Sequence, residues 1–348
     1  MSSLFDVLPE LRARVPWVAL ADLPTPVESG ARLVQALGAS GELWLKRDDL
    51  SSAIYGGNKL RMLEHLLPEA QQSGTQRVYA TGAMGSSFSL ATALHAPRLG
   101  LKAGVIAFPQ PMTPESERSH QALAGRARLI EIPHWSLLPL ASERARRRGE
   151  QEAERVCVFS QVRMSPVAML GYVAAGLELA MQIAGGECPE PTSLVLPIGS
   201  AATTAGVLAG IGLACQLGIG FRHMPWVQAV RIAAWPLSRR SRVQSLAAGV
   251  LAHLASLQQK PRFRAQDVDL TRLRIVADQL GAGYPHPTPA SVQARLLFSR
   301  EGWPILDETY SGKAAAHLVN MLQSANAEGP TLFWCTKSSA PLPDRLPA

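Results

Sequence analysis

The amino-acid sequence predicts an α/β protein whose open, twisted, mostly parallel sheets are flanked by helices. The first observation is that short β-rich runs alternate with helical patterns along most of the chain, and strands separated by helices form parallel sheets through right-handed crossovers. The second is composition, because 47% of the residues are hydrophobic and only 18% are charged, a balance typical of a chain with a large core. With 348 residues, the chain is long enough for about two domains.

The predicted strands are short apolar runs bounded by turn-forming residues. In chain order they cover residues 43–46, 77–81, 103–108, 128–132, 156–159, 193–198, 227–234 and 332–335. The predicted helices lie between them and carry apolar residues at helical spacing. They cover residues 60–71, 86–99, 114–123, 137–155, 167–183, 204–217, 242–258, 290–300 and 313–325. No fixed-period repeat or low-complexity linker interrupts this alternation.

The net charge of +7 raises the question of an anionic partner. The densest basic stretch, residues 144–148, is flanked by glutamates on a predicted helix, which indicates a solvated helix face. A second cluster, Arg239, Arg240 and Arg242, has no interleaved aromatic residues. Because nucleic-acid grooves combine basic and aromatic side chains, we expect no nucleic-acid partner.

The four cysteines lie far apart, no CxxC pair occurs, and none of the eight histidines has the spacing of an HExxH zinc site. We therefore expect free thiols and no metal centre. The N-terminal residues lack the basic and apolar regions of a signal peptide. Together these observations favour a cytoplasmic protein.

Residues 191–221 contain no charged side chain, and this stretch is long enough to cross a bilayer. However, Pro197, Gly199 and Gly206 interrupt it, and such residues would leave backbone groups unpaired in lipid. A buried strand, a turn and a buried helix fit the pattern better. We therefore expect no membrane association.

The first segment that could carry chemistry consists of KRDDL at 46–50 followed by YGGNKLR at 55–61. The Gly-Gly pair permits unusual backbone dihedrals, and Lys59 stands in the first turn of a predicted helix. The positive potential at a helix N-terminus disfavours an ammonium and favours a neutral, nucleophilic amine. An exposed lysine on a surface helix is the alternative interpretation of this segment alone.

Two further segments have a strand that ends in a turn of small residues before a helix. They are YATGAMGSSFS at 79–89 and LVLPIGSAATTAG at 194–206. Free N–H groups at such turns bind anions, here a carboxylate and a phosphate. Ordinary helix capping by Ser86 or Ser87 is the simpler alternative for the first segment, and a plain tight turn is the alternative for the second.

The last two segments each combine a turn with a hydroxyl-bearing residue. GAGYP at 281–285 places Tyr284 after a Gly-rich loop, and DETYSGKA at 307–314 places Ser311 in a turn before an apolar helix. Taken singly, these residues are a loop aromatic and a helix cap.

Taken in order, these five segments resemble the family of pyridoxal-phosphate enzymes that includes 1-aminocyclopropane-1-carboxylate deaminase and D-cysteine desulfhydrase. The resemblance extends from LPTP at 23–26 to about Thr336 and is most specific at 46–61. It implies the tryptophan-synthase-β-like fold (fold type II), in which a small α/β domain at 63–169 is inserted into a large cofactor-binding domain formed by 1–62 and 170–348. It also implies pyridoxal 5'-phosphate as cofactor, a small amino-acid substrate and a homodimer.

The resemblance assigns cofactor-binding roles to specific residues. Lys59 would hold the cofactor as a Schiff base, Asn58 would hydrogen-bond its phenolic oxygen, and Ser311 would face its pyridine nitrogen. The phosphate would be received by the loop residues Gly199, Ser200, Ala201, Ala202 and Thr203. A neutral hydroxyl at Ser311 leaves the pyridine largely unprotonated, which favours elimination and points towards the desulfhydrase side of the family.

The resemblance also implies substrate-binding and catalytic residues. Ser86 and Ser87 would bind the substrate carboxylate, and Ser86 or Lys59 would assist proton transfer. Tyr284 and Tyr310 would line the pocket beside the substrate. We therefore expect a lyase or deaminase that eliminates a β-substituent from a small amino acid and releases a keto acid and ammonia.

Several positions depart from the family pattern, and they cluster around the cofactor. Met62 stands where a basic residue would assist the phosphate, and residues 85–88 lack the usual amide and imidazole. Ala201 and Ala202 replace two glycines of the phosphate loop, and CTKS at 335–338 replaces an HTGG-like turn. Two alternatives remain open. We expect Phe88 and Met62 to make the pocket more apolar than the family's, which favours an enzyme of specialised metabolism with a bulkier substrate or a β-replacement outcome. The other alternative is a non-catalytic relative that serves as a binding or scaffold protein.

Overall fold

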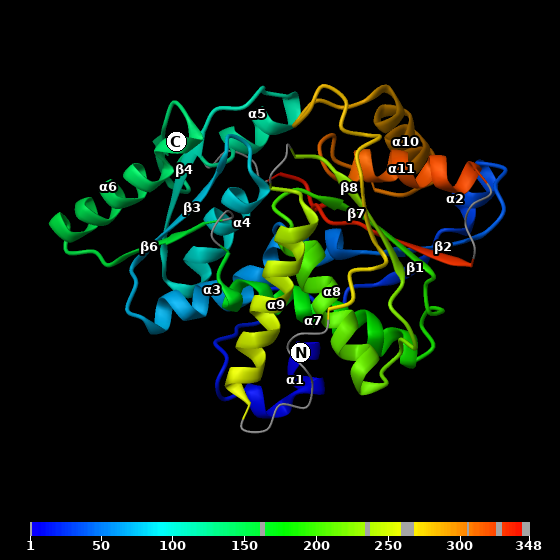
Figure 1. Ribbon diagram of the computed structural model, residues 1–348. Helices are drawn as coiled ribbons and strands as arrows, with labels where there is room; N and C mark the ends of the chain where they lie inside the picture. Colours follow the sequence, from blue (N-terminus) through cyan, green and yellow to red (C-terminus); the bar gives the residue numbers. More distant parts are fainter. Residues whose placement is uncertain are drawn as a thin grey trace.

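The computed structural model describes residues 2–160, 164–233, 237–258, 268–304, 306–324 and 329–342. In these ranges the chain forms a six-stranded sheet and a four-stranded sheet, with helices on both faces of each (Figure 1). The predicted α/β class is therefore confirmed. The predicted element ends at residues 234 and 325 lie outside the described residues.

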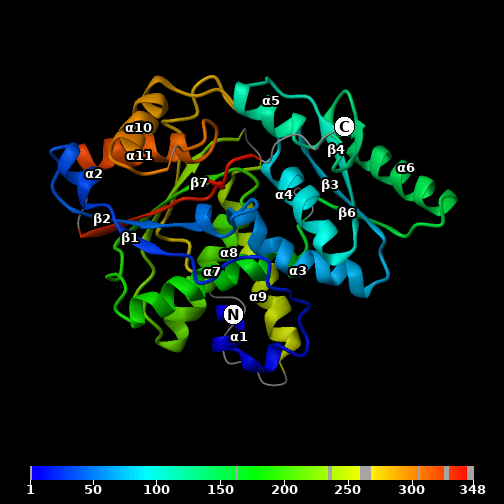
Figure 2. The ribbon, with the colours of Figure 1, turned by 180° about the vertical axis from the view of Figure 1, so that it is seen from behind.

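The six-stranded sheet has the order β1-β2-β10-β7-β8-β9, and every neighbouring pair is parallel except β1 and β2. Its strands are β1 (Val27–Ser29), β2 (Glu42–Lys46), β10 (Pro330–Trp334), β7 (Ser193–Ile198), β8 (Trp226–Arg231) and β9 (Leu273–Val276). One face is covered by α1 (Ser3–Val7), α7 (Pro166–Ala184), α8 (Ala202–Leu217) and α9 (Arg240–Leu257). The other is covered by α2 (Ala31–Ala36), α10 (Pro289–Arg300) and α11 (Ser311–Gln323), as Figure 2 shows from behind.

The four-stranded sheet is entirely parallel and has the order β5-β4-β3-β6. Its strands are β3 (Arg77–Ala83), β4 (Lys102–Phe108), β5 (Arg128–Glu131) and β6 (Val156–Phe159). Val78 and Ala80 of β3 face the main core with α3 (Asn58–Gln72) and α4 (Ser87–His95), whereas Tyr79 faces α6 (Leu138–Gln151). The helix α5 (Pro114–Gln121) follows β4. The domain boundaries at residues 62 and 169 stay a prediction.

The uncharged stretch 191–221 forms the buried strand β7, a turn and the buried helix α8, as predicted. The helix α7 is also long and apolar enough to span a membrane, but 78% of its most apolar window is buried inside the protein. Such burial is typical of a core helix. Gly171 of α7 allows the closest approach to α3, because a Cβ there would lie 2.0 Å from the carbonyl oxygen of Arg61.

Several element ends differ from the prediction. The helix α6 stops at Gln151 rather than residue 155, because Ala153 turns into a left-handed conformation with φ of 54°. The helix α4 stops at His95 and continues to Leu99 as a 3₁₀ turn, since Pro97 lacks the N–H that an α-helix needs. The strand β8 ends at Arg231 rather than residue 234. The short elements β1, β9, α1 and α2 were not predicted.

Two predictions about side chains are confirmed. In the basic stretch of α6, Arg147 pairs with Glu143 and Arg148 pairs with Glu152 on an exposed face. All four cysteines are free thiols.

Candidate active site

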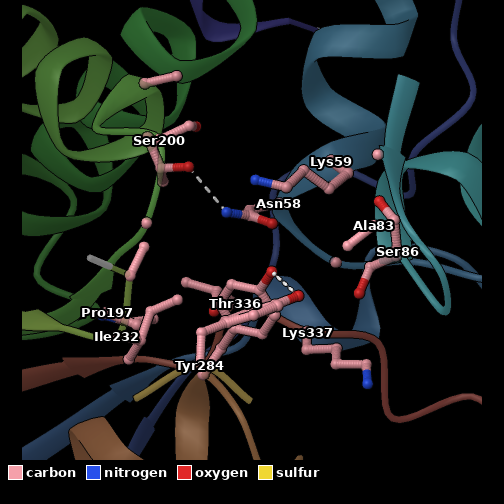
Figure 3. Close-up of a pocket in the computed structure, with 18 of the residues that line it drawn as sticks. Asn58, Lys59, Ala83, Ser86, Pro197, Ser200, Ile232, Tyr284, Thr336 and Lys337 are labelled. Carbon is pink, nitrogen blue, oxygen red and sulfur yellow. Dashed lines mark hydrogen bonds between the residues drawn. The ribbon is translucent and has the colours of Figure 1, made fainter. Parts of the chain in front are cut away.

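A cavity of about 300 Å³ lies where the carboxyl ends of strands from both sheets meet the first turns of α3, α4 and α8 (Figure 3). This is the position at which parallel α/β sheets bind ligands. It gathers every predicted site residue except Ser311, namely Asn58, Lys59, Ser86, Ser87, Gly199, Ser200, Ala201, Ala202, Thr203, Tyr284 and Tyr310. Five segments that are far apart in the sequence therefore form one site.

The backbone before α3 determines where Lys59 lies. Gly57 has φ of 89°, and a Cβ at this position would lie 2.8 Å from the carbonyl oxygen of Thr336. The next residue, Asn58, donates its backbone N–H to that same oxygen at 2.8 Å. Only glycine tolerates both this dihedral and this close approach. The start of α3 is thereby joined to the segment that follows β10.

A buried ion network holds the first turn of α3. Arg61 is fully buried, and its guanidinium donates to Asp48 at 2.6 and 3.0 Å and to Glu178 of α7 at 2.8 and 3.0 Å. Lys46 of β2 donates to the same Glu178 at 2.6 Å. Two cations and two carboxylates balance in this network, as buried charges require. The charged residues of the 46–61 segment therefore position Lys59 and do not line the cavity.

The amine of Lys59 faces the cavity and has no hydrogen-bond acceptor among the residues that the structure describes. Burial lowers the pKa of Lys59 to about 8, because desolvation penalises the ammonium. A sizeable fraction is therefore the neutral, nucleophilic amine near neutral pH. The sequence predicted a lowered pKa for Lys59, and the direction of the shift agrees with that prediction. Its cause is burial rather than the helix N-terminus.

The loop between β7 and α8 presents an anion-binding turn. Ala201 adopts a left-handed conformation with φ of 69°, which directs the chain into the first turn of α8. Thr203 accepts a hydrogen bond at 2.8 Å from Asn58 Nδ2, which is drawn as a dashed line in Figure 3. From α9, Arg242 Nε donates to the carbonyl oxygen of Ser200 at 3.0 Å. The first N–H groups of α8 have no acceptor within their own helix.

A pair of tyrosines forms another side of the cavity. The hydroxyls of Tyr284 and Tyr310 lie 3.0 Å apart, and their rings meet edge to face with centroids 5.8 Å apart. Burial raises the pKa of both phenols, so both stay protonated near neutral pH. Lys313 of α11 donates to the carbonyl oxygens of Leu280 and Gly283 at 2.9 and 3.1 Å and thereby holds the loop that carries Tyr284.

A sequence model of the family described as pyridoxal-phosphate dependent enzymes matches residues 18–336. The chain belongs to this family. It is 32% identical to the nocardicin C-9' epimerase of Nocardia uniformis subsp. tsuyamanensis over 301 residues, which cover 85% of this chain and 86% of that protein. It is 31% identical to the D-cysteine desulfhydrase of Salmonella choleraesuis (strain SC-B67) over 339 residues, covering 92% of this chain and 93% of that protein.

Solved structures share the fold. The crystal structure of an ACC deaminase homologue superimposes with a TM-score of 0.76 and 26% identity, covering 97% of this chain and 95% of that one. A threonine deaminase from Solanum lycopersicum superimposes with a TM-score of 0.60 and 16% identity, covering 96% and 84%. The predicted tryptophan-synthase-β-like fold is therefore confirmed, and the protein is a pyridoxal-phosphate-dependent enzyme of the ACC deaminase and D-cysteine desulfhydrase type.

The cavity fits the cofactor of this family. Thr204 Oγ1, in the first turn of α8, is buried and has no hydrogen-bond partner among the described residues. A phosphate there would accept from this hydroxyl and from the free N–H groups of the 199–204 loop. Asn58 contacts that loop through its hydrogen bond to Thr203, and Lys59, the next residue, also lines the cavity, so both would reach a cofactor whose phosphate lies at the loop.

Ser86 and Ser311 occupy different kinds of position. Ser86 caps α4, and its Oγ accepts from the N–H of Ser89 at 3.4 Å, so the capping alternative and the cavity position are both observed. Ser311 does not line the cavity, because its Oγ lies 3.5 Å behind that of Thr336, which does. Its role opposite the pyridine nitrogen stays a prediction, and the intervening Thr336 is another neutral hydroxyl.

Other residues of the cavity wall were not predicted. Thr336, Lys337 and Ser338 line it from the segment after β10, which the sequence marked as a departure from the family pattern. Its apolar surface comes from Phe108, Leu138, Ile232 and Leu237. We expected Met62 and Phe88 to make the pocket apolar, but both are buried outside it. Met62 instead packs against α7, where its sulfur accepts a hydrogen bond from Tyr172 at 3.1 Å.

Proposed function

We propose that this enzyme removes the Cα proton of a small amino acid and eliminates a β-substituent, as a D-cysteine desulfhydrase does. The observation that carries the proposal is the amine of Lys59, which lies in the cavity with its pKa lowered to about 8. Tyr284 enters the cavity from the side opposite Lys59 in Figure 3, and its hydroxyl lies 3.0 Å from that of Tyr310, which also lines the cavity. A base and a proton donor therefore flank the space in which a substrate would lie.

Each residue has a role that follows from its chemistry. The bound cofactor supplies an electron sink for the electron pair left when the Cα–H bond breaks. Lys59 in its neutral form takes the Cα proton, and a protonated tyrosine donates to the departing β-substituent. Ser86 and the free N–H groups at the start of α4 bind the substrate carboxylate. With water, a β-thiol amino acid would yield a keto acid, ammonia and hydrogen sulfide, because the departing SH group takes one proton.

Two neutral hydroxyls, one in the cavity wall and one behind it, support elimination. The hydroxyls of Thr336 and Ser311 carry no charge, so they would not keep a pyridine nitrogen protonated. The gathering of Lys59, Ser86 and Tyr284 in one cavity argues against a purely structural scaffold, which has no physical need for these side chains together.

A second candidate is inversion at Cα of a bulkier amino acid. Lys59 and Tyr284 approach from opposite sides, so a proton removed on one face could be replaced on the other. The apolar wall formed by Phe108, Leu138 and Ile232 would accommodate a larger side chain. The relative named above, nocardicin C-9' epimerase, is by its name an enzyme that inverts a stereocentre of its own substrate.

Absorbance and product analysis test these proposals. We expect the purified protein to bind pyridoxal phosphate with a visible absorbance band that Lys59→Ala abolishes and Lys102→Ala, a change at an exposed lysine, retains. The rate at which the apoprotein gains this band should rise with pH and reach half its maximum near pH 8. A protein that stays colourless with added cofactor would exclude the proposed function.

The reaction type is then read from the products. With D-cysteine or D-serine, elimination releases a keto acid and ammonia in equal amounts. Inversion instead exchanges the Cα hydrogen for deuterium in D₂O and releases no ammonia. Turnover by β-replacement with an added thiol would contradict both reaction types.

A further inference from the structure

A second cavity, of about 390 Å³, adjoins the active site. The two cavities share Lys337 and Ser338 as lining residues. The charged and aromatic side chains that line this second cavity are Tyr55, Glu115, Arg118, Arg295, Asp307 and Lys337. It has no part in the mechanism derived above, so its polar lining calls for a separate explanation.

The carboxylates of the second cavity are already engaged. Asp307 accepts from the backbone N–H groups of Thr309, Tyr310 and Ser311 at 3.0, 2.6 and 2.8 Å. Glu115 accepts from the ammonium of Lys337 and from the backbone N–H of Glu308 at 3.1 Å.

Two of the three lining cations are already paired with carboxylates. Lys337 pairs with Glu115, and Arg295 pairs at 3.4 Å with Glu308, which is not itself a lining residue. Arg118 is exposed on α5, and its guanidinium has five N–H donors. A cavity with satisfied acceptors and one cation without a carboxylate partner among the described residues favours a ligand that carries a single negative charge.

A buried hydroxyl also faces this ligand space. Tyr55 lines the second cavity and is only 2% exposed. Its hydroxyl lies near Ser87 of the active site but forms no hydrogen bond within the described residues. An unsatisfied buried hydroxyl is costly, and a ligand oxygen would satisfy it. Tyr55 and Lys337 therefore stand together at the junction of the two cavities.

We infer that the second cavity is a subsite for the distal carboxylate of an elongated amino-acid substrate. This inference rests on the proposed function, because the reacting carbon of that substrate would lie at Lys59. The distal carboxylate would accept from the hydroxyl of Tyr55 and from Lys337, with Arg118 at the outer end. A carboxylate fits better than a phosphate dianion, because Arg118 is the one lining cation without a carboxylate partner among the described residues.

The test compares matched amino acids on the holoenzyme. Calorimetry would measure Kd for 2-aminoadipate and 2-aminopimelate against norleucine and 2-aminoheptanoate, each in both enantiomers, while absorbance reports contact with the cofactor. We expect one dicarboxylate to bind at least about 10-fold more tightly than its uncharged counterpart, the gain typical of a charge-assisted hydrogen bond. Equal affinities at both chain lengths would overturn the inference.

Substitutions of lining residues test whether the second cavity causes the preference for a dicarboxylate. Tyr55→Phe and Arg118→Gln should each reduce the dicarboxylate preference about 3- to 10-fold. Arg144→Gln, at an arginine of α6 that lines neither cavity, should leave it unchanged. Because Arg118 is exposed, its variant should fold even if Tyr55→Phe does not. A preference that survives Arg118→Gln and Tyr55→Phe would place the carboxylate elsewhere and overturn the inference.

The inference and the proposed function fail in different ways. If amino acids change the absorbance of the holoenzyme without any preference for a distal carboxylate, the subsite is wrong and the proposed function stands. If the protein never acquires a cofactor band, the proposed function is wrong and the subsite falls with it.

Discussion

Ala201 is held in a left-handed conformation at the entrance of α8, with φ of 69°. This backbone conformation costs a non-glycine residue on the order of 1–2 kcal/mol. Lys59 is also held in an unfavourable setting, because burial penalises its ammonium and lowers the pKa of its amine to about 8. Such strain persists where the surrounding structure enforces it, and it concentrates at functional sites.

We expect Ala201→Gly to stabilise the apoprotein by about 0.5–1 kcal/mol, because the relieved strain exceeds the added backbone entropy of glycine. Ala202→Gly is the matched control, since Ala202 is the first residue of α8 and has ordinary helical geometry. That change should destabilise by up to about 1 kcal/mol. Urea denaturation measures both, and equal losses in the two variants would contradict the strain argument.

The element that departs most from the family pattern is the loop between β7 and α8. Its usual cationic support from α3 is missing, because Met62 occupies that position and its sulfur pairs with Tyr172. The support present here comes from α9, where Arg242 donates to the carbonyl oxygen of Ser200. This hydrogen bond orients the peptide group that leads into Ala201. We therefore propose that a cation on α9 supports this loop in place of the cation that the family pattern puts on α3.

We expect Arg242→Gln to raise the Kd for pyridoxal phosphate about 10-fold or more, because a charge-assisted hydrogen bond to the loop is lost. Arg239→Gln is the control, since Arg239 is exposed and stands three residues earlier, before α9 begins. Absorbance titration of the apoprotein with cofactor measures both constants. An unchanged Kd in Arg242→Gln would show that the loop does not need this support.

At the scale of the whole molecule, one buried ion network joins β2, α3 and α7. Glu178 of α7 accepts from Arg61 of α3 and from Lys46 of β2. These cations hold the pKa of Glu178 well below its usual value of 4.5. A carboxylate of this kind stabilises the fold above the pKa of its unfolded state, and that contribution is lost as pH falls below about 4.5.

We expect Glu178→Gln to destabilise the protein by about 3–5 kcal/mol at neutral pH, because it leaves two buried cations with one carboxylate. Glu143→Gln, at an exposed glutamate of α6, should cost less than about 1 kcal/mol. Urea denaturation at pH 7 and pH 4 measures both, and the deficit of Glu178→Gln should shrink at the lower pH. A loss below 1 kcal/mol at pH 7 would contradict this account of the network.

Most of the fold could be predicted from the sequence because its signals are local. Burial can be predicted from an apolar run in a strand, as in β3, β4 and β7. It can likewise be predicted from the apolar residues of a helix, as in α7 and α8. The elements β1 and β9 were missed for the opposite reason. The three residues of β1 carry no periodic signal, and they become a strand only by pairing with β2.

The residues of the candidate site also fall into those that the sequence could reveal and those that it could not. Lys59, Ser86 and the 199–203 loop could be found because each follows a turn of small residues at the start of a helix. Tyr55 and Lys337 were not found, although each lies in a segment that the sequence singled out, because their contacts at the second cavity join residues far apart in the chain. Lys337 meets Glu115 across 222 residues of chain, and Arg242 meets Ser200 across 42.

The sequence by itself determined the α/β class, the order of the main elements and the lysine on which the family's chemistry depends. The tertiary structure decided which cation supports the phosphate loop, what lowers the pKa of Lys59, and that a second polar cavity adjoins the first. The physical reason is that helices and strands follow from hydrophobic periodicity within a segment. Charge pairing, desolvation and cavities depend instead on segments that only folding brings together.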